Sequence, residues 1–423
     1  MYSWHSLCST SVSVTQFPAK VLRGLVESCA CLRRRGARCI ATAGVAGLLY
    51  LASLTRTKAE DRADYHYEDY AEDNNRIHVT TQDVYFDLGL KSWVSLAGNF
   101  VYDAISGATP TGAPPLSGQT EVAKVHMHDR RYAGFLEPTI KVANHSLTPQ
   151  FSYSQESDYR SIGVSLGDAI DFNEKNTTLA LGVSHNFDEV QPNEGEFYLL
   201  GTPITKPLHK DDTDVLVGLS QLLGPNTIVS GDVTLGYSDG YLSDPYRRVL
   251  FDDVPYTPGT PFTVWPENRP DHKFKQIAFL SLQQYFDPLN GALELDYRFY
   301  HDTFEVTAHT VTVQWNQKLG KRVIISPLFR YYTQTAAFFY ATHFPGDPDN
   351  QQSFPLPGYY SSDYRLSALD TFTYGVELSV KIQEHLSLQF GYRRYIMQGR
   401  DNVTAADAYP KANIFSGGLT LWF

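Results

Sequence analysis

Charged residues alternate with apolar residues along several stretches of this sequence. In 291–300, three charged residues occupy every second position, with a leucine or an aromatic residue between them. The pattern recurs elsewhere, and the charged positions that it selects are Asp232, Glu294, Asp296, Arg298, Arg322, Arg330, Glu377, Lys381 and Arg393. A charged side chain costs about 2–4 kcal/mol on a lipid-facing surface at the bilayer midplane. We therefore expect these side chains to face an aqueous interior. Opposed rows of acids and bases there can create a transverse electric field across an open pore, or they can form ion pairs that close it.

Two imidazoles, a thioether and a carboxylate stand together in His126-Met127-His128-Asp129. Such a set could hold a soft or borderline metal ion. We place the segment in an outer loop, 107–130, where a lone His-x-His pair usually binds nothing with useful affinity. We therefore expect no metal site and no cofactor, with His126 and His128 as the positions where a metal would bind if one did.

Other residues could bind or act on lipid. Arg247, Arg248 and Arg269 lie in a Pro-rich stretch, 239–269, and could meet an anionic ligand or a lipopolysaccharide phosphate. The alternative is a loop that packs on itself. A hydrolase would need a serine, such as Ser106 or those of Tyr-Ser-Ser-Asp at 360–363, beside His301 or His309. Nothing in the sequence fixes such a pair, so we do not expect an enzyme.

The elements that position the charged residues are strands. After residue 59 no helical period exceeds about three turns, and roughly ten-residue stretches of alternating polarity follow one another. Fifteen strands are clear, and the even number found in single-chain bacterial barrels requires a sixteenth, at 62–70. Fourteen strands, or one missed strand inside a long loop, are the alternatives. The expected strands are 62–70, 77–90, 93–106, 131–143, 147–154, 161–171, 177–187, 213–222, 227–238, 273–285, 291–300, 305–315, 322–332, 369–381, 385–397 and 411–423.

Tight turns between these strands alternate strictly with longer connections. Short periplasmic turns and long outer loops are typical of a single antiparallel transmembrane β-barrel in an outer membrane. The pattern thus predicts an all-β membrane protein with the carboxyl terminus and seven tight turns in the periplasm. The loops 107–130, 239–272 and 333–368 are long enough to fold inward and constrict the lumen.

The last thirteen residues, 411–423, support this fold. Counting back from the terminal aromatic residue, every second position is apolar or glycine. A strand with one apolar face and a terminal aromatic residue resembles the signal that bacterial barrel-assembly machinery recognises. The residues of the expected signal are Phe415, Leu419, Leu421 and Phe423.

The first 59 residues differ from the rest of the chain. They contain all four cysteines, eight Lys and Arg residues and one acidic residue, which leaves a cysteine-free body, 60–423, with a net charge of −18. Arg33–Arg38 precedes a sixteen-residue apolar run, 39–54, which suits a secretory signal peptide. We expect cleavage after Ala59, with a signal anchor as the alternative, and translation starting downstream of Met1. The acidic body argues against nucleic-acid binding.

Several segments resemble a family of Gram-negative outer-membrane proteins known as domain of unknown function 3570. They include VYDAISGATPTGAPP at 101–115, SYSQESDYRSIGVSL at 152–166, LGYSDGYLSDPYRRV at 235–249, YRFYHDTFEVTAHTV at 297–311, PLFRYYTQTAAFFYATHFPGDP at 327–348 and AYPKANIFSGGLTLWF at 408–423. The resemblance covers essentially all of 62–423. It implies an outer-membrane barrel and assigns no reaction.

These observations lead to one expected function and two rivals. We expect a porin-like passive channel, constricted by inward loops and surrounded by outer-membrane lipid and lipopolysaccharide. The first rival is a non-conducting scaffold or receptor for a partner, such as a periplasmic lipoprotein. The second is a lipid hydrolase at the outer rim. The sequence does not fix the permeant solute or the oligomeric state.

Overall fold

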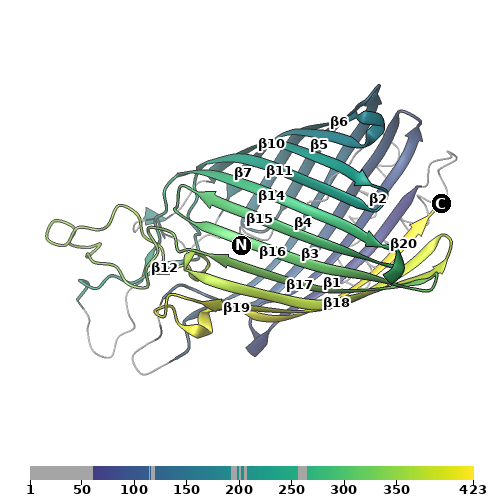
Figure 1. Cartoon of the computed structure of the whole chain (residues 1–423). Coiled ribbons are helices and arrows are strands. Elements are labelled where there is room, and N and C mark those ends of the chain that lie inside the picture. The colour runs from purple at the N-terminus through teal and green to yellow at the C-terminus, as the bar shows by residue number, and fades with distance from the viewer. Residues whose placement is uncertain are drawn as a thin grey trace, which may run out of the picture.

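The computed structural model describes residues 61–113, 115, 120–191, 198–199, 202–203, 207–255 and 264–423. Sixteen antiparallel strands form one closed barrel, each paired with its neighbours in the sequence of strands. Figure 1 shows the barrel, with the long loops gathered at one end and the carboxyl terminus at the other. The expected leader, 1–59, lies outside the described residues.

The barrel strands agree with the sixteen expected from the sequence, including the first. Their bounds are β1 Arg62–Glu72, β2 His78–Lys91, β3 Val94–Pro110, β4 Lys124–Val142, β5 His145–Gln155, β6 Tyr159–Phe172, β7 Thr177–Val190, β10 Leu208–Gly224, β11 Thr227–Gly240, β14 His272–Phe286, β15 Gly291–Asp302, β16 Thr307–Leu319, β17 Val323–Gln334, β18 Leu369–Gln383, β19 Leu386–Gly399 and β20 Lys411–Trp422. The prediction of a sixteen-stranded membrane barrel is therefore confirmed.

The remaining elements are short. Two small hairpins lie outside the barrel, formed by β8 Tyr198–Leu199 with β9 Thr202–Pro203 and by β12 Arg248–Val249 with β13 Trp265–Pro266. The 3₁₀ turns are η2 Asp73–Asn75, η3 Asn173–Lys175, η4 Asp287–Leu289, η5 Tyr364–Leu366 and η6 Ala406–Ala408. None of the helices in the described ranges is long and apolar enough to span a membrane.

The first and last strands close the barrel. Their ladder runs without a register shift from Arg62 opposite Trp422 to Glu72 opposite Ala412. It continues one residue further, where the backbone N–H of Asp61 donates to the carbonyl of Phe423 (3.1 Å) and the N–H of Phe423 donates back (2.9 Å). The sheet therefore has no free edge at this seam, as a strand in hydrocarbon requires.

Alternate residues on each strand face opposite sides of the wall. Large apolar side chains with high exposure mark the outer face, for example Val376 (44 %), Phe390 (56 %) and Phe415 (55 %). Residues directly opposite one another in the ladder share a face, so this assignment extends around the whole barrel. At the end of β20, Phe415, Leu419, Leu421 and Phe423 all lie on the outer side, and Phe423 packs against Leu88 and Leu96.

The two ends of the barrel differ as the sequence predicts. The end that holds the carboxyl terminus has short turns, several of them closed by asparagines in the left-handed conformation, such as Asn173 (φ 49°) and Asn290 (φ 51°). We call it the turn end, and the opposite one the loop end (Figure 1).

One loop assignment is wrong. His126, Met127 and His128 lie on β4, because the β3–β4 ladder continues from the barrel wall as far as Pro110 opposite Lys124. His126 and His128 are exposed on the outer side of that extension. The loop between β3 and β4 is therefore only 111–123.

Closure at the β1–β20 seam can be tested with a disulfide, since the chain after residue 59 has no cysteine of its own. Tyr67 and Gly417 are direct partners on the outer face, at the separation of about 4.5–5.5 Å that a disulfide spans. We expect the double variant Y67C/G417C to cross-link on oxidation, giving a band with altered mobility on unreduced gels. The offset pair Y67C/L419C is the control. Equal cross-linking of both pairs would contradict the register.

Candidate functional site

The lumen wall holds the charged residues that the sequence selects. Ladder register and the outer-face markers place eight of the nine on the inner side of the wall: Asp232, Glu294, Asp296, Arg298, Arg330, Glu377, Lys381 and Arg393. Arg322 instead lies in the turn between β16 and β17, outside the strands. The roles of these residues in selectivity remain predictions.

The contacts of these side chains differ. The Asn316 amide donates to Glu294 (2.8 Å), and Arg393 lies 3.6 Å from Glu68 on β1. Within the described ranges, Arg298 and Arg330 make no salt bridge and no side-chain hydrogen bond. The two groups are therefore charges that face the lumen without a direct counter-ion.

The lumen wall also carries charged residues beyond the nine that the sequence selects, and these form ion pairs. Arg131 pairs with Asp103 (2.6 Å), and Lys275 with Asp214 (2.8 Å). Lys210 pairs with both Asp188 (3.1 Å) and Asp212. The alternation of polarity could have found Asp103 and Asp214, whereas Lys210 lies before the expected start of its strand. On β4, β10 and β14 the lumen wall thus carries several compensated pairs.

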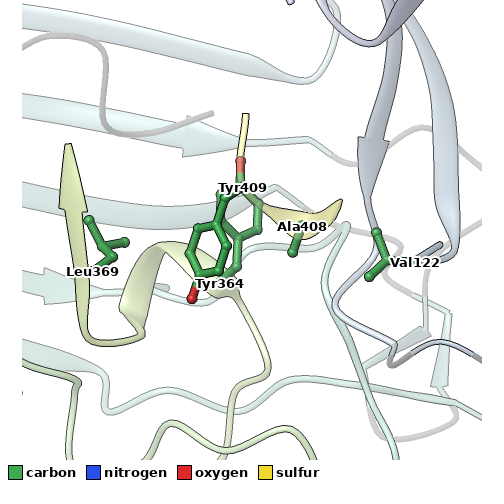
Figure 2. Packing of buried hydrophobic residues seen from close by; sticks show 5 residues of the cluster. All are labelled: Val122, Tyr364, Leu369, Ala408 and Tyr409. Atoms are coloured by element: carbon green, nitrogen blue, oxygen red, sulfur yellow. The ribbon is translucent and has the colours of Figure 1, made fainter. Parts of the chain in front are cut away.

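Four long connections pack together at the loop end. We call them the loop cap, which comprises the described residues of 111–123, 241–271, 335–368 and 400–410. Two apolar clusters lie within it, centred on Tyr364 and Phe251, and a third joins it to the turn between β15 and β16, where Phe304 and Val306 pack against Ala337 and Phe339. Figure 2 shows the first, in which the rings of Tyr364 and Tyr409 lie between Leu369 and the side chains of Ala408 and Val122. The two rings meet edge to face, with centroids 5.8 Å apart.

Buried ionic groups tie the loop cap together. We call the ion cluster the three arginines and three carboxylates that meet between 241–271 and 335–368, namely Asp244, Arg247, Glu267, Arg269, Asp363 and Arg365. The cluster has no net formal charge. Asp363, 1 % exposed at its side chain, lies 2.8 Å from Arg269 and 2.9 Å from the Nε of Arg365. Arg365 also reaches Asp244 (2.6 Å), while Arg269 reaches Glu267 (2.6 Å).

The electrostatics of the ion cluster centre on Asp363. Burial alone would raise the pKa of this carboxyl, but the guanidiniums of Arg365, Arg247 and Arg269 hold it well below its usual range. Ser361 connects the same groups, because its hydroxyl donates to Glu267 and accepts from the backbone N–H of Asp363 (3.1 Å). Arg247 and Arg269, expected to meet an anionic ligand or to pack within the loop, here pair with carboxylates of the chain itself.

The loop cap is joined to the mouth of the lumen. Gln334, on the inner face of β17, donates to the carbonyls of Arg365 (2.9 Å) and Ser367 (2.8 Å). Arg76, after η2, donates to the carbonyl of Ala408 (3.1 Å). The cap is therefore anchored to the rim of the barrel at its loop end.

Three carboxylates meet at the loop-end hairpin between β5 and β6. Oxygen atoms of Asp129, Glu156 and Asp158 lie within 4.8 Å of one another, and within the described ranges they form the one group of this kind. Burial raises the pKa of Glu156 to about 7, with Asp158 and Asp129 adding to the effect. Burial and Asp129 raise that of Asp158 to about 6. His126 and His128 do not belong to this group.

The histidines considered for a hydrolase have other partners. The Nδ1 of His301 lies 3.0 Å from the Thr307 hydroxyl, and the Nδ1 of His309 lies 2.8 Å from the Tyr297 hydroxyl. Ser361 bonds Glu267, and Ser362 donates to the carbonyl of Ala341 (2.8 Å). Within the described ranges these histidines and serines do not meet, so the geometry assembles no nucleophile and base from them.

A closed barrel with an apolar outer face, a charged lumen wall and a capped mouth defines this protein as a sixteen-stranded transmembrane β-barrel. Its sequence then places it in a family. The chain belongs to the family described as a protein of unknown function (DUF3570), whose model matches residues 36–418. That match begins inside the expected leader. No curated protein matches the sequence.

Solved structures with similar folds share little sequence with this chain. The siderophore receptor PirA from Pseudomonas aeruginosa is 8 % identical, with a TM-score of 0.41 over 86 % of this chain and 62 % of its own. CdiB from Acinetobacter baumannii is 9 % identical, with a TM-score of 0.48 over 87 % and 61 %. The outer membrane protein OpdK from P. aeruginosa is 8 % identical, with a TM-score of 0.42 over 86 % and 98 %. The chain thus spans about three-fifths of the first two.

Removing the central charge of the ion cluster should loosen the loop cap. D363N leaves three arginines short of a counter-charge in a buried site, and breaking a buried ion pair costs about 3–5 kcal/mol. We expect faster cleavage of 335–368 by limited proteolysis, with the barrel itself intact. The control is D349N, an exposed position in the same loop whose side chain makes no ion pair in the described structure. Equal cleavage rates in both variants would show that the cluster does not hold the cap.

The hairpin at 156–158 should respond to pH. A carboxyl whose folded pKa is raised destabilises the folded hairpin once it ionises, so local stability falls as pH rises from about 4 through the folded pKa values, about 6 and about 7. We expect less hydrogen-exchange protection of 155–159 at pH 8 than at pH 5, after correction for intrinsic exchange. The E156Q/D158N variant should lose this difference. A pH response that survives in the variant would assign it elsewhere.

Proposed function

We propose that this protein is a passive channel for small solutes in the bacterial outer membrane, narrowed at its loop end by the loop cap. The observation that carries the proposal is the polar inner wall. Charged side chains such as Glu377 and Lys381 face the lumen and are exposed. A wall of this composition favours water, and a sixteen-stranded barrel is wide enough for an aqueous passage.

The same reasoning gives a location and an orientation. We infer that a cleaved signal peptide in 1–59 exports the chain and that the turn end faces the periplasm, with the loop cap outside. The outward residues Phe415, Leu419, Leu421 and Phe423 suit recognition by the barrel-assembly machinery. Lipid and lipopolysaccharide would surround the apolar outer face. The proposal includes no enzyme activity and no cofactor.

A non-conducting receptor or scaffold is the second candidate, and the loop cap is the observation that favours it. A cap held by buried ion pairs and three apolar clusters could close the mouth and present a rigid surface to a partner. A periplasmic lipoprotein at the turn end is one such partner. The two functions differ in whether ions pass while the cap is intact.

Current through a planar lipid bilayer separates the two candidates. We expect discrete conductance steps from the purified protein. D363N should give larger or more frequent openings, because the cap that narrows the mouth is loosened, while D349N should behave like the wild type. The reversal potential in a salt gradient then reports the sign of the charges that govern the constriction.

Two outcomes would count against a channel. Silence of both the wild type and D363N, with each protein folded and heat-modifiable, would overturn conduction and favour the scaffold. Silence of the wild type with conduction by D363N would show a lumen that the cap seals. In that case the open state would require release of the cap.

A further inference from the structure

Two arginines of the lumen wall differ from the others in their partners. On the described strands, Arg62 pairs with Asp64 (2.7 Å), Arg131 with Asp103 (2.6 Å) and Arg393 with Glu68 (3.6 Å). Among the residues that the structure describes, Arg298 and Arg330 have no carboxylate within salt-bridge distance. A guanidinium offers five N–H donors and stays charged at any physiological pH. Because no carboxylate of the described residues pairs with these two groups, their donors lack a charged acceptor.

Register places the two arginines near one another. Arg298 on β15 is opposite Thr310 on β16, and Arg330 on β17 is opposite Thr312, the next inward residue of the same strand. The strands β15 and β17 are two positions apart, about 10 Å. Arginine side chains extend several ångströms, so both can approach one small ligand above β16.

Threonine hydroxyls line the same region. Thr310 and Thr312 lie between the arginines, and Thr373 on β18 is opposite Arg330. In the described structure none of the three hydroxyls makes a hydrogen bond. The wall from β15 to β18 therefore presents two guanidiniums and two partly exposed hydroxyls to the lumen, with the buried hydroxyl of Thr373 (8 % exposed) beside Arg330.

The tyrosine hydroxyls at the edge of this region already have hydrogen-bond partners. Towards the loop end, the hydroxyl of Tyr332 donates to Gln334 (2.5 Å) and that of Tyr300 donates to Asp302 (2.5 Å). On the other side, Phe279 lies between Arg298 and Asp232 along the ladder row, and Asp232 still interacts electrostatically with Arg298 without forming a salt bridge. Asp296, two residues from Arg298 on β15, makes no salt bridge with it. Neighbouring acids thus moderate the positive potential without occupying the guanidiniums.

We propose that Arg298 and Arg330, with Thr310, Thr312 and Thr373, form a binding site for a small oxyanion in the lumen. Carboxylates and phosphates share the required chemistry, since their paired oxygens match the fork of a guanidinium. Threonine hydroxyls would donate to the remaining oxygens. The site rests on the proposed function in one respect, namely that solutes enter the lumen, and it adds their class.

The test measures how oxyanions affect current through the protein in planar bilayers. Sodium phosphate and sodium acetate, added separately to a potassium chloride background, should reduce wild-type current in a saturable way. The salt that blocks the current at the lower concentration identifies the preferred class of oxyanion. R298Q and R330Q should each weaken the apparent affinity by about tenfold or more, because each removes a charged, forked donor that pairs with the oxygens of the anion. R330K should recover part of the loss, since it keeps the charge without the fork.

The matched control is K175Q, which removes one positive charge from a turn-end residue that is 82 % exposed at its side chain. It should leave the block unchanged. If the wild type conducts and neither salt blocks it, or if R298Q, R330Q and K175Q behave alike, the oxyanion site is overturned while the channel stands.

An equilibrium measurement covers the case in which the protein does not conduct. Titration calorimetry of phosphate and of acetate into the detergent-solubilised protein should show saturable binding that R298Q/R330Q abolishes and K175Q keeps. Binding without conduction would support the site and overturn the channel. Absence of binding by the folded wild type would overturn the site, whatever the bilayer shows.

Discussion

The fold depends on one constraint, which is that a strand in hydrocarbon cannot leave its backbone polar groups unpaired. The uninterrupted ladder between β1 and β20 meets it, because it removes the last free edge of the sheet. Closure of the barrel also determines which side of the wall each residue faces. Once the register is fixed around the ring, each residue faces either lipid or lumen, and a shift by one residue would place Glu294, Asp296 and Arg298 in the membrane.

Charged side chains of the inner wall and of the loop cap are neutralised in two different ways. On the inner wall, Arg131, Lys210 and Lys275 are each matched with a carboxylate. In the ion cluster, the three carboxylates are almost fully buried and three arginines balance their charge. Desolvation offsets most of the attraction within such a cluster, so its net contribution to stability is small, although removing one partner is costly. Arg298 and Arg330, on β15 and β17, belong to neither scheme, because within the described ranges neither has a counter-ion.

The sequence predicts the strands well and the loops poorly, for a physical reason. Alternation of polarity is local, so sixteen strands and the faces of Glu294 or Arg393 follow from a few residues at a time. The ion cluster is not local, because Asp244 and Asp363 are more than a hundred residues apart and only the closed barrel brings their loops together. The sequence does not reveal that β4 extends through His126, because a strand that continues beyond the membrane has no apolar face to mark it.

The wide separation of its partners also gives the ion cluster a place in the order of folding. Asp244 and Arg247 follow β11, whereas Asp363 and Arg365 precede β18, and every strand between them must be placed before the two loops can meet. Closing so long a segment of chain costs entropy that the ion pairs cannot offset until the wall exists. We therefore expect the ion cluster to form late, after the wall between β11 and β18 is in place.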